Sequence, residues 1–449
     1  MKKEEINYII LLLIHVGIGF MVYLLPILAK LYGFLGLFIG MYYVIQSKNR
    51  NHECLYAAAY LVGSELLLRM TNGNITYEFS KYGVMIFIFM GMLYTGFSKK
   101  GYIYWLFIIL LIPGVILSTF SLNFDTDIRK AIAFNISGPI CLALTALYTY
   151  RRAITLQQFN NLMLALGLPI VSAMIYLIFY TPNIRDVITG TASTYATSGG
   201  FGPNQVATYL GLGMFVFFSR VILESKSKII VIINLIIAFN FFYRGMVTFS
   251  RGGMVTGLLM FGILLLSLYF KTNGVGKLKL GLIIIIIGAV MVGAWSYTSF
   301  QTGGLINKRY ANQDAAGREK ENKFTGREMI ALSEIDMFFD NPILGVGVGK
   351  GVEIRKEKSG VFVLSHDEIT RMMAEHGSLG VLGLLILILT PMALYFEKGY
   401  NIYLLCLLSF WFLTINHAAM RTAVSAFVYG IALLNVKLMP DKSISKQQN

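Results

Sequence analysis

The feature that most constrains this chain is a series of long segments without a charged side chain. Two clear examples are Tyr102–Phe120 and Leu280–Tyr297. About 20 apolar residues are needed for a helix to cross a bilayer, because lipid offers exposed backbone amides no hydrogen-bond partner. A buried core helix of a soluble protein explains one such segment but not a dozen of them. The sequence therefore predicts many helices in lipid.

Similar apolar segments recur along the whole chain. They lie near residues 7–25, 27–46, 54–70, 82–97, 102–120, 131–149, 161–180, 204–222, 229–243, 253–270, 280–297, 377–396, 400–415 and 421–437. The shortest are compatible with re-entrant segments, so we expect about 12 to 14 transmembrane helices. Only 14% of the 449 residues are charged, against about a quarter in a soluble domain. We therefore predict one all-α polytopic membrane domain over residues 1–449.

The connections between these segments alternate in charge. Every second one is basic, and the basic set contains Lys48, Arg50, Lys99, Lys100, Arg151, Arg152, Arg220, Lys226, Lys228, Lys271, Lys277, Lys279, Lys398, Lys437, Lys442 and Lys446. Positive charge marks the cytoplasmic side, so both termini are predicted to be cytoplasmic. Lys30, Lys81, Arg129 and Lys130 fall on the opposite side and weaken the bias. The net charge of +15 is thus attributed to topology, and a nucleic-acid partner is not expected.

The longest connection on the opposite side covers residues 298–376, and we expect it to be a large extracytoplasmic loop with short helices. Thr325-Gly326-Arg327-Glu328 has the spacing of a helix capping box. Apolar residues then recur every three or four positions until Asn341-Pro342, which ends the predicted helix. Arg327 in the first turn is unfavourable for the helix dipole. It is therefore either a solvated surface side chain or a ligand-binding group.

A second capping box, Ser365-His366-Asp367-Glu368, predicts another helix that runs past Glu375 into the apolar segment after Gly377. His366 would be the first helical residue. A helix start favours an anionic ligand nearby and favours the neutral imidazole, which is the form that acts as a base. The alternative is a polar histidine at the membrane interface with no chemical role.

Two further motifs concern glycine and arginine. The run Gly345–Gly351 lacks the spacing of a nucleotide-binding loop, and we expect a flexible turn or a close approach of backbone to a glycan or diphosphate. Ser250-Arg251-Gly252-Gly253 begins an apolar segment, with Arg244 shortly before it. Guanidinium groups match phosphate oxygens, although arginines at a membrane edge also occur as interfacial anchors. The two glycines allow a neighbouring helix or a lipid-linked substrate to come close.

Together, these motifs resemble the bacterial O-antigen ligase and polymerase family, which are membrane glycosyltransferases of the GT-C type. The resemblance rests on Ser250–Gly253, Thr325-Gly326-Arg327 leading to Asn341–Gly347, His366-Asp367 leading to Glu375–Gly380, and Gly202-Pro203-Asn204. It covers about residues 200–395, an O-antigen ligase-like region, whereas the first half agrees only in being hydrophobic. Each motif is weak alone, and their order and spacing make the set specific.

The resemblance implies an undecaprenyl-diphosphate-linked glycan as donor, transferred on the extracytoplasmic side to an acceptor hydroxyl. Arg251 and Arg327 match the arginines that hold the diphosphate in this family, and His366 matches its essential histidine. Arg244 is a further candidate for the diphosphate. Ligases often carry a leucine four residues after the arginine of the outer loop, and here Ala331 stands there, with Leu332 next. This departure weakens a ligase relative to a polymerase.

The chemistry agrees with the resemblance. A sugar diphosphate is a good leaving group whose developing charge arginines can stabilise without a metal, and a neutral His366 can accept the proton of the acceptor hydroxyl. Asp367, Glu368 and Glu375 are alternative bases or orient the histidine, and Asn204, Gly252 and Gly377 are expected to support the site. No carboxylate pair has metal-ligand spacing, and the three cysteines lie far apart. We therefore predict neither a metal nor a cofactor.

The predicted protein is a multi-pass protein of the bacterial inner membrane, with its active site facing the periplasm, surrounded by membrane lipids. The leading function is an O-antigen ligase with lipid A-core as acceptor. A polysaccharide polymerase and a protein O-oligosaccharyltransferase differ from it only in the acceptor. A transporter or flippase for lipid-linked glycans needs ionisable residues near mid-membrane. Glu65 and Arg69, one helical turn apart, are the main such residues and are interpreted as a structural ion pair.

Overall fold

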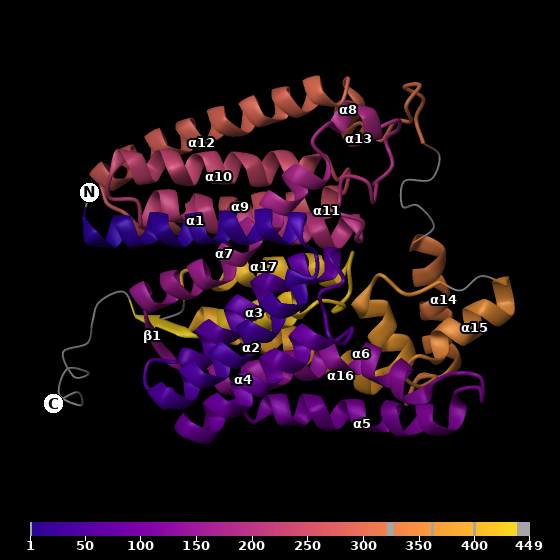
Figure 1. The fold of residues 1–449 in the computed structure, drawn as a ribbon. Helices are drawn as coiled ribbons and strands as arrows, with labels where there is room; N and C mark the ends of the chain where they lie inside the picture. Colours follow the sequence, from indigo (N-terminus) through magenta and orange to yellow (C-terminus); the bar gives the residue numbers. More distant parts are fainter. Residues whose placement is uncertain (1, 321–326, 361–362, 398–400, 438–449) are drawn as a thin grey trace. The chain divides into compact units, whose positions relative to one another are not determined.

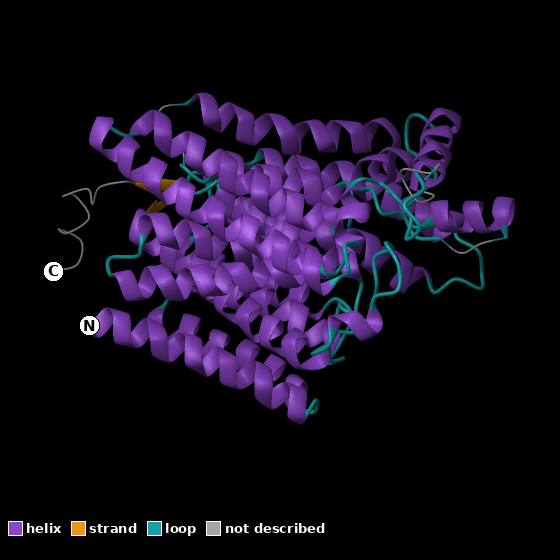
Figure 2. Ribbon diagram, turned by 90° about the horizontal axis from the view of Figure 1, so that it is seen from above, coloured by secondary structure: helices purple, strands orange, loops and turns teal. Residues whose placement is uncertain are grey.

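The computed structural model describes residues 2–320, 327–360, 363–397 and 401–437. Nearly all regular structure in these residues is helical, and Figure 2 shows the two short strands as the exception. The elements, labelled in Figure 1 where there is room, are α1 (Lys3–Leu24), α2 (Leu28–Ser47), α3 (Glu53–Met70), α4 (Phe79–Thr95), η1 (Lys99–Gly101), α5 (Ile103–Ser121), α6 (Ile128–Thr149), β1 (Ala153–Thr155), α7 (Leu156–Tyr180), α8 (Ile184–Val187), α9 (Pro203–Leu223), α10 (Lys228–Met246), α11 (Arg251–Lys271), α12 (Gly274–Gln301), α13 (Leu305–Tyr310), α14 (Arg327–Asp340), α15 (Lys350–Ser359), α16 (Glu368–Phe396), α17 (Leu404–Ile415), α18 (Ala423–Ala432) and β2 (Asn435–Lys437).

Each apolar segment predicted from the sequence coincides with one of these helices. Within the described ranges, ten helices are long and apolar enough to cross a membrane, namely α1, α2, α5 with η1, α6, α7, α9, α10, α11, α12 and α16. The remaining predicted segments are α3, which carries three charged residues, and the shorter helices α4, α17 and α18, of 17, 12 and 10 residues. The prediction of an all-α polytopic membrane protein is confirmed.

The chain divides into two compact units. The first unit contains residues 1–83 and 155–321, and the second contains residues 84–154 and 322–449. The long connection between α12 and α16 is therefore shared, because α13 belongs to the first unit and α14 and α15 belong to the second. α12 extends to Gln301, slightly beyond the predicted end of its span.

In the first unit, α9 packs against both α10 and α11, and α7 packs against α1 and α3. Small residues allow the closest of these approaches. A Cβ atom at Gly211 of α9 would lie 2.2 Å from the carbonyl oxygen of Gly253, and one at Gly257 would lie 2.5 Å from the carbonyl oxygen of Gly211. Gly253 and Gly257 are spaced as in the small-xxx-small pattern of membrane helix pairs. Gly253 thus contacts a neighbouring helix. The sequence predicted that either a neighbouring helix or a lipid-linked substrate would come close to it.

Two buried cations in the first unit are paired with carboxylates. Arg69 and Glu65 form an ion pair at 2.8 Å within α3, and the Tyr209 hydroxyl donates to the same carboxylate at 2.6 Å. The predicted structural pair is confirmed, and these bonds offset part of the cost of burying the two charges. Lys81, which departs from the charge bias of the connections, is also fully buried and lies 2.5 Å from Glu78.

In the second unit, α6 and α17 pack against α18, and α5 packs against α6 and α16. The helices α14 and α15 lie against α16, as Figure 1 shows. The hydroxyl groups of Tyr104 on α5 and Tyr429 on α18 are 3.0 Å apart in the interior.

α16 changes direction sharply at Gly377, whose φ of 59° and ψ of −141° are not helical. A Cβ atom at Gly380 would lie 2.1 Å from the carbonyl oxygen of Met372, eight residues earlier. In a straight helix those residues would be about 12 Å apart along the axis. Residues 368–376 therefore fold back along the start of residues 378–396. The apolar second piece begins where the sequence predicted the span to begin.

The glycine run packs against this bend. The Val346 amide donates to the Ala374 carbonyl at 2.9 Å, and the Gly347 amide donates to the Glu375 carbonyl at 3.2 Å. A Cβ atom at Gly377 would lie 2.6 Å from the carbonyl of Ile343. The backbone that the glycine run approaches in the structure is that of α16, whereas the sequence suggested a flexible turn or a close approach to a glycan or diphosphate.

The helix contact between α9 and α11 yields a first prediction. Gly257→Val places a branched side chain against the α9 backbone, and such overpacking costs roughly 1–3 kcal/mol. We expect a lower melting temperature in detergent. Gly262→Val is the matched control, because Gly262 is on the same helix and a Cβ there meets no atom within 4 Å. Equal melting temperatures for the two variants would contradict this packing.

Candidate functional site

In the second unit, His366 lies just before α16. The N-cap of this helix is Asp367, whose side chain accepts the Ile369 amide at 2.7 Å. The predicted capping box with Ser365 as the cap is therefore wrong by two residues, because the Ser365 hydroxyl is engaged elsewhere, and His366 is not a helical residue. The other predicted capping box begins at Thr325-Gly326, which lies outside the described residues, and α14 is described from Arg327 onward.

Three contacts fix the backbone beside His366. The Ala419 amide donates to the His366 carbonyl at 3.1 Å, and the Arg421 guanidinium donates to the Ser365 carbonyl. The Ser365 hydroxyl donates to the Glu334 carboxylate at 3.1 Å. His366 is thereby held between α14 and the connection of residues 416–422, which joins α17 to α18.

His366 is surrounded by positive charge. Burial is the main cause that lowers its pKa to about 4, and the neighbouring Arg421, Arg327 and His417 lower it further. The imidazole is therefore neutral at neutral pH, as the sequence predicted. The predicted cause was the start of a helix, whereas the structure gives burial and two nearby guanidinium groups.

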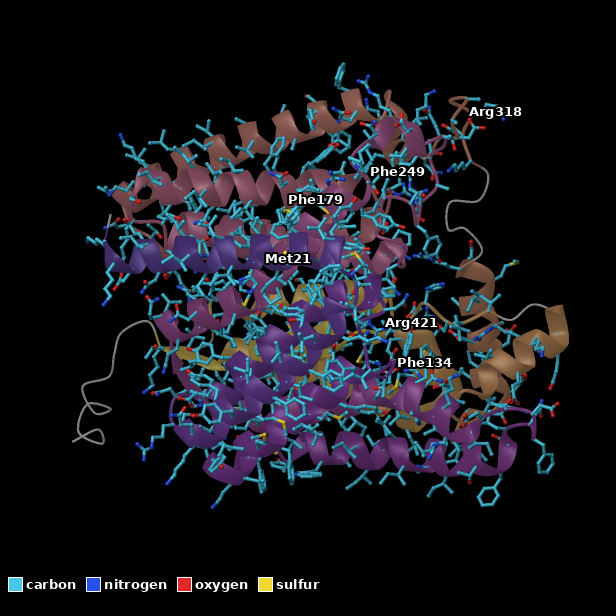
Figure 3. The ribbon with its side chains drawn as sticks, viewed as in Figure 1. Met21, Phe134, Phe179, Phe249, Arg318 and Arg421 are labelled. Atoms are coloured by element: carbon cyan, nitrogen blue, oxygen red, sulfur yellow. The ribbon has the colours of Figure 1, made fainter. Side chains whose placement is uncertain are left out.

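The surroundings include a second neutral imidazole. Burial lowers the pKa of His417 to about 4, and Arg327 adds to this effect. Its Nδ1 atom lies 2.7 Å from the Leu413 carbonyl, so Nδ1 carries the proton and Nε2 is the acceptor nitrogen. The Arg421 guanidinium lies over the Phe134 ring, 6.0 Å from its centre (Figure 3). The arrangement thus combines two neutral bases with two guanidinium groups, which suits an anion and a group that loses a proton.

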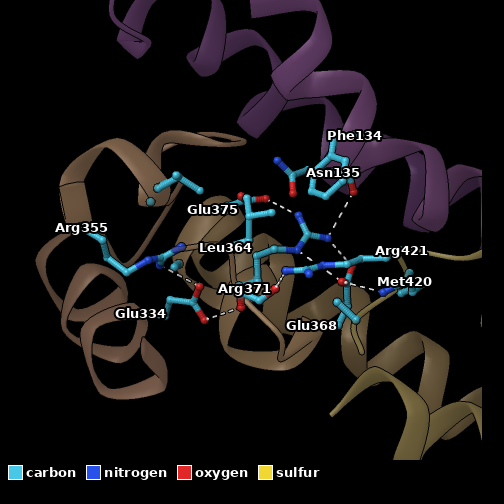
Figure 4. A pocket seen from close by; sticks show the side chains of 15 residues that line it. Phe134, Asn135, Glu334, Arg355, Leu364, Glu368, Arg371, Glu375, Met420 and Arg421 are labelled. Carbon is cyan, nitrogen blue, oxygen red and sulfur yellow. Dashed lines mark hydrogen bonds and ion pairs between the residues drawn. The ribbon is translucent and has the colours of Figure 1, made fainter. Parts of the chain in front are cut away.

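Two of the predicted carboxylates belong to a buried ion cluster, shown in Figure 4. Arg371 donates to both Glu368 and Glu375, and it also donates to the Asn135 carbonyl on α6 at 3.2 Å. The Gly349 amide donates to Glu375 at 2.9 Å, and the Met420 amide donates to Glu368 at 3.2 Å. These bonds compensate both charges, so Glu368 and Glu375 join α16 to its neighbours.

Asp367, the third predicted carboxylate, acts as the helix cap, and burial raises the pKa of its carboxyl.

Glu334 is a site residue that the sequence reasoning missed. Its carboxylate is 2% exposed and accepts from Arg355 at 2.9 Å and from Thr370 at 2.6 Å, besides Ser365. Burial raises its pKa, against the effect of these donors. Glu334 lies seven residues after Arg327, two turns along the same helix face. That spacing is the signal that could have pointed to it.

Arg421 was missed for a different reason. The connection of residues 416–422 looks like a short loop between apolar segments, and its basic residue resembles an interfacial anchor. The bonds from Ala419 to the His366 carbonyl and from Arg421 to the Ser365 carbonyl show that this loop adjoins the histidine. The ion cluster borders a cavity of about 20 Å³ lined by Arg421, Glu334 and Arg371 among others, which is room for one water molecule.

The first unit contains the other predicted residues. Arg251 is the first residue of α11, is half-buried and donates to the Arg309 carbonyl at 3.4 Å. Gly252 follows it on the same helix. The Ser250 hydroxyl donates to Asn204 at 2.8 Å, so the motifs around residues 204 and 250 meet. Arg244 is 5% exposed and donates to the Thr181 carbonyl at 2.9 Å.

Two cations that the sequence reasoning missed lie near Arg251. The pKa of Lys320 is lowered by burial and then by the charges of Arg309 and Arg251. The pKa of the Tyr310 phenol is raised by burial to about 12, although Arg251 and Arg309 oppose this rise. Arg251, Arg309 and Lys320 thus form a cationic cluster in the first unit, and this cluster favours an anionic ligand.

The predicted residues therefore fall into two groups. Arg327, His366, Asp367, Glu368, Glu375 and Gly377 belong to the second unit, and Asn204, Arg244, Arg251 and Gly252 belong to the first. In the described part of the chain, no group of three or more histidine, cysteine, aspartate or glutamate side chains is arranged to hold a metal ion.

Comparison with known proteins points to one family. No curated protein matches the chain. The model of the family described as O-antigen ligase matches residues 233–388, a segment that lies inside the region predicted from the motifs and includes Arg251, Arg327 and His366. The suspected resemblance is thereby confirmed, because residues 233–388 of this multi-pass membrane protein match the O-antigen ligase family.

Proposed function

We propose that this protein is a glycosyltransferase that transfers a glycan from an undecaprenyl-diphosphate carrier to an acceptor hydroxyl on the extracytoplasmic side of the bacterial inner membrane. The O-antigen ligase family match and the membrane helices support an enzyme of the O-antigen ligase and polymerase type. The observation that carries the proposal is His366, a neutral and half-buried imidazole flanked by Arg327 and Arg421. We assign lipid A-core as the acceptor, as in a ligase.

In this proposal, His366 is the general base that removes the proton from the acceptor hydroxyl. The hydroxyl oxygen then attacks the first sugar carbon, and the bond from that carbon to the diphosphate breaks. The diphosphate leaves with the electron pair, and arginine side chains stabilise its charge. Arg327 serves this role in the second unit, and Arg251 serves it in the first with support from Arg309 and Lys320.

Because cations lie beside His366, its pKa depends on whether the donor is bound. A diphosphate bound at Arg327 offsets part of the positive field that holds the pKa of His366 low. The pKa of His366 therefore rises toward its ordinary value when the donor is bound, and a base of higher pKa accepts a proton more readily. Deprotonation of the acceptor is thus favoured in the loaded enzyme.

Glu334 and the ion cluster around Arg371 are positioning residues in this scheme. Glu334 holds Ser365, which is next to His366, and it sits on the helix that begins with Arg327. Glu368 and Glu375 hold the folded-back start of α16. Their carboxylates are compensated by Arg371, so His366 is preferred over them as the base.

A polymerase that joins repeat units is the second candidate, and Ala331 in place of the leucine frequent in ligases favours it. A protein O-oligosaccharyltransferase differs again only in its acceptor. A transporter or flippase is less well supported, because its candidate charges Glu65 and Arg69 form an ion pair with each other near the end of α3.

The first functional prediction concerns His366→Ala. General-base catalysis contributes roughly 10² to 10⁴ in rate, so the variant should lose transfer while it still binds the lipid-linked donor. The measurement is the lipopolysaccharide ladder of a deletion strain that expresses the variant. Loss of all long chains with donor accumulation identifies a ligase, and retention of a single repeat unit identifies a polymerase. A normal ladder would refute the base assignment, and Asp367→Asn and Glu375→Gln then test the carboxylates.

The pH dependence provides a second test. Protonation of His366 removes the base, so kcat/KM should fall with decreasing pH only near the lowered pKa of about 4. Arg421→Gln removes a charge that lowers this pKa, and the acid limb should move to higher pH. Arg421→Lys keeps the charge and serves as the control, with a limb near that of the wild type. An acid limb that does not move in Arg421→Gln would rule out His366 as the titrating group.

The arginines are tested by replacements that keep the charge. An ammonium group cannot make the paired contacts of a guanidinium, and a charge-assisted hydrogen bond contributes about 1.5–3 kcal/mol, or a factor of about 10 to 100. Arg327→Lys and Arg251→Lys should each lose activity on this scale. Arg318→Lys is the control, because Arg318 is exposed and pairs with Asp314. Full activity in both variants at normal expression would refute the diphosphate assignment.

A further inference from the structure

A second polar pocket lies in the second unit, at the opposite end of α16 from His366. It is lined by Ser98, Lys100, Tyr150, Arg151, Arg152 and Asn435, and its volume is about 420 Å³. Pockets for small ligands occupy about 300–1,000 Å³. These residues follow the ends of α4, α6 and α18, and Glu397 directly follows the end of α16. They belong to the basic side of the chain, which is the cytoplasmic side by the charge bias.

Arg152 is a fixed charge in this pocket. Its guanidinium donates to the carbonyls of Tyr148 at 2.8 Å and of Gly96 at 2.6 Å. It also lies over the Tyr148 ring, 4.0 Å from the centre. The side chain is thereby held in one position, so that its charge is present before any ligand binds.

Arg151 is held by its backbone. Its φ of 57° lies in the left-handed region, which is uncommon for a residue other than glycine. The Arg151 amide donates to the Leu433 carbonyl at 2.9 Å, and the Asn435 amide donates to the Arg152 carbonyl at 2.9 Å. These bonds tie the turn after α6 to the end of α18. The two adjacent arginines are therefore presented from a rigid turn.

The charge of the pocket is only partly balanced. Glu397 pairs with Arg151, whereas Lys100 is exposed and has no ion pair within the described residues. Three cations thus face one carboxylate. Ser98, Tyr150 and Asn435 add hydroxyl and amide groups that can donate hydrogen bonds. A phosphate group matches this combination of fixed guanidinium, ammonium and neutral donors.

Exposed aromatic side chains are close in sequence to the residues of this pocket. Phe97 precedes Ser98, Tyr102 follows shortly after Lys100, and Phe396 precedes Glu397; these side chains are 51%, 71% and 79% exposed. Aromatic side chains at the ends of membrane helices mark the level of the lipid headgroups. Acyl chains can therefore lie against these side chains while a phosphate occupies the polar interior.

We propose that this pocket binds the phosphate of an anionic phospholipid headgroup at the cytoplasmic surface of the membrane. Basic pockets between membrane helices on this side are suited to such headgroups. The lipid joins the ends of α6, α16 and α18, and these helices carry or adjoin the His366 region at their other ends. The proposal does not depend on the reaction, because it rests on the pocket alone.

The test measures the melting temperature of the full-length protein in detergent with added phosphatidylglycerol or phosphatidylcholine. Phosphatidylglycerol should stabilise the wild type more than phosphatidylcholine does. A juxtamembrane cation contributes about 1 kcal/mol to binding an anionic surface, so Lys100→Gln/Arg151→Gln should bind phosphatidylglycerol about ten- to thirty-fold more weakly. Lys277→Gln/Lys279→Gln is the matched control, with the same charge change at exposed residues elsewhere on the basic side, and it should respond as the wild type does.

Two results would overturn the proposal. One is an unchanged phosphatidylglycerol response in Lys100→Gln/Arg151→Gln. The other is equal stabilisation of the wild type by inorganic phosphate and by phosphatidylglycerol at the same concentration. That result would assign the pocket to free phosphate. If the double variant is not expressed, Lys100→Gln alone is compared with Lys100→Arg, which keeps the charge. Native mass spectrometry should then show phosphatidylglycerol retained by Lys100→Arg and lost from Lys100→Gln.

Discussion

The second unit depends on the buried ion cluster of Arg371, Glu368 and Glu375. Removing three charges from water costs several kcal/mol for each ion, and the cost is offset only when the charges are paired and their remaining hydrogen bonds are made. Here backbone groups of three other segments supply those bonds, namely α6, the glycine run and the connection of residues 416–422, while the ion pairs themselves lie within α16. The loss of one partner would leave a buried charge uncompensated. The cluster therefore fixes which segments meet around the start of α16, and the surroundings of His366 follow from that arrangement.

Glycine makes the same arrangement possible. The glycine run can contact the bend of α16 only because neither backbone carries a side chain at the contact, since Cβ atoms at Gly345 and Gly377 would overlap the opposite backbone. Both residues also have positive φ angles, which other residues rarely adopt. The ion cluster and the glycines thus act together, because Glu375 of the cluster accepts the Gly349 amide of the glycine run.

The sequence alone was sufficient to predict the membrane helices, because the bilayer requires long apolar segments that can be counted directly. It was also sufficient for the Glu65–Arg69 pair, whose partners are one helical turn apart. It was not sufficient for Glu334, Arg355 or Arg421, because Arg355 pairs with Glu334 across 21 residues, and Ser365, which bonds to both Glu334 and Arg421, is farther still from each. The position of the α16 cap was wrong for the same reason, since Ser365 bonds to Glu334 on another helix. Of these residues, only Glu334 has a local signal, which is its two-turn spacing from Arg327 on one helix face.

The short lengths of α17 and α18 have a consequence for the membrane around His366. With 12 and 10 residues, these helices extend only about 18 Å and 15 Å, whereas the hydrocarbon core is about 30 Å thick. Neither helix is long enough to cross that core, and two amides of the connection between them donate to the His366 carbonyl and the Glu368 carboxylate. Such a mismatch is relieved by local thinning of the bilayer or by a recess that water enters. In the proposed function, such a recess would let His366 meet an acceptor hydroxyl below the headgroup plane, within reach of a carrier whose tail stays in the lipid.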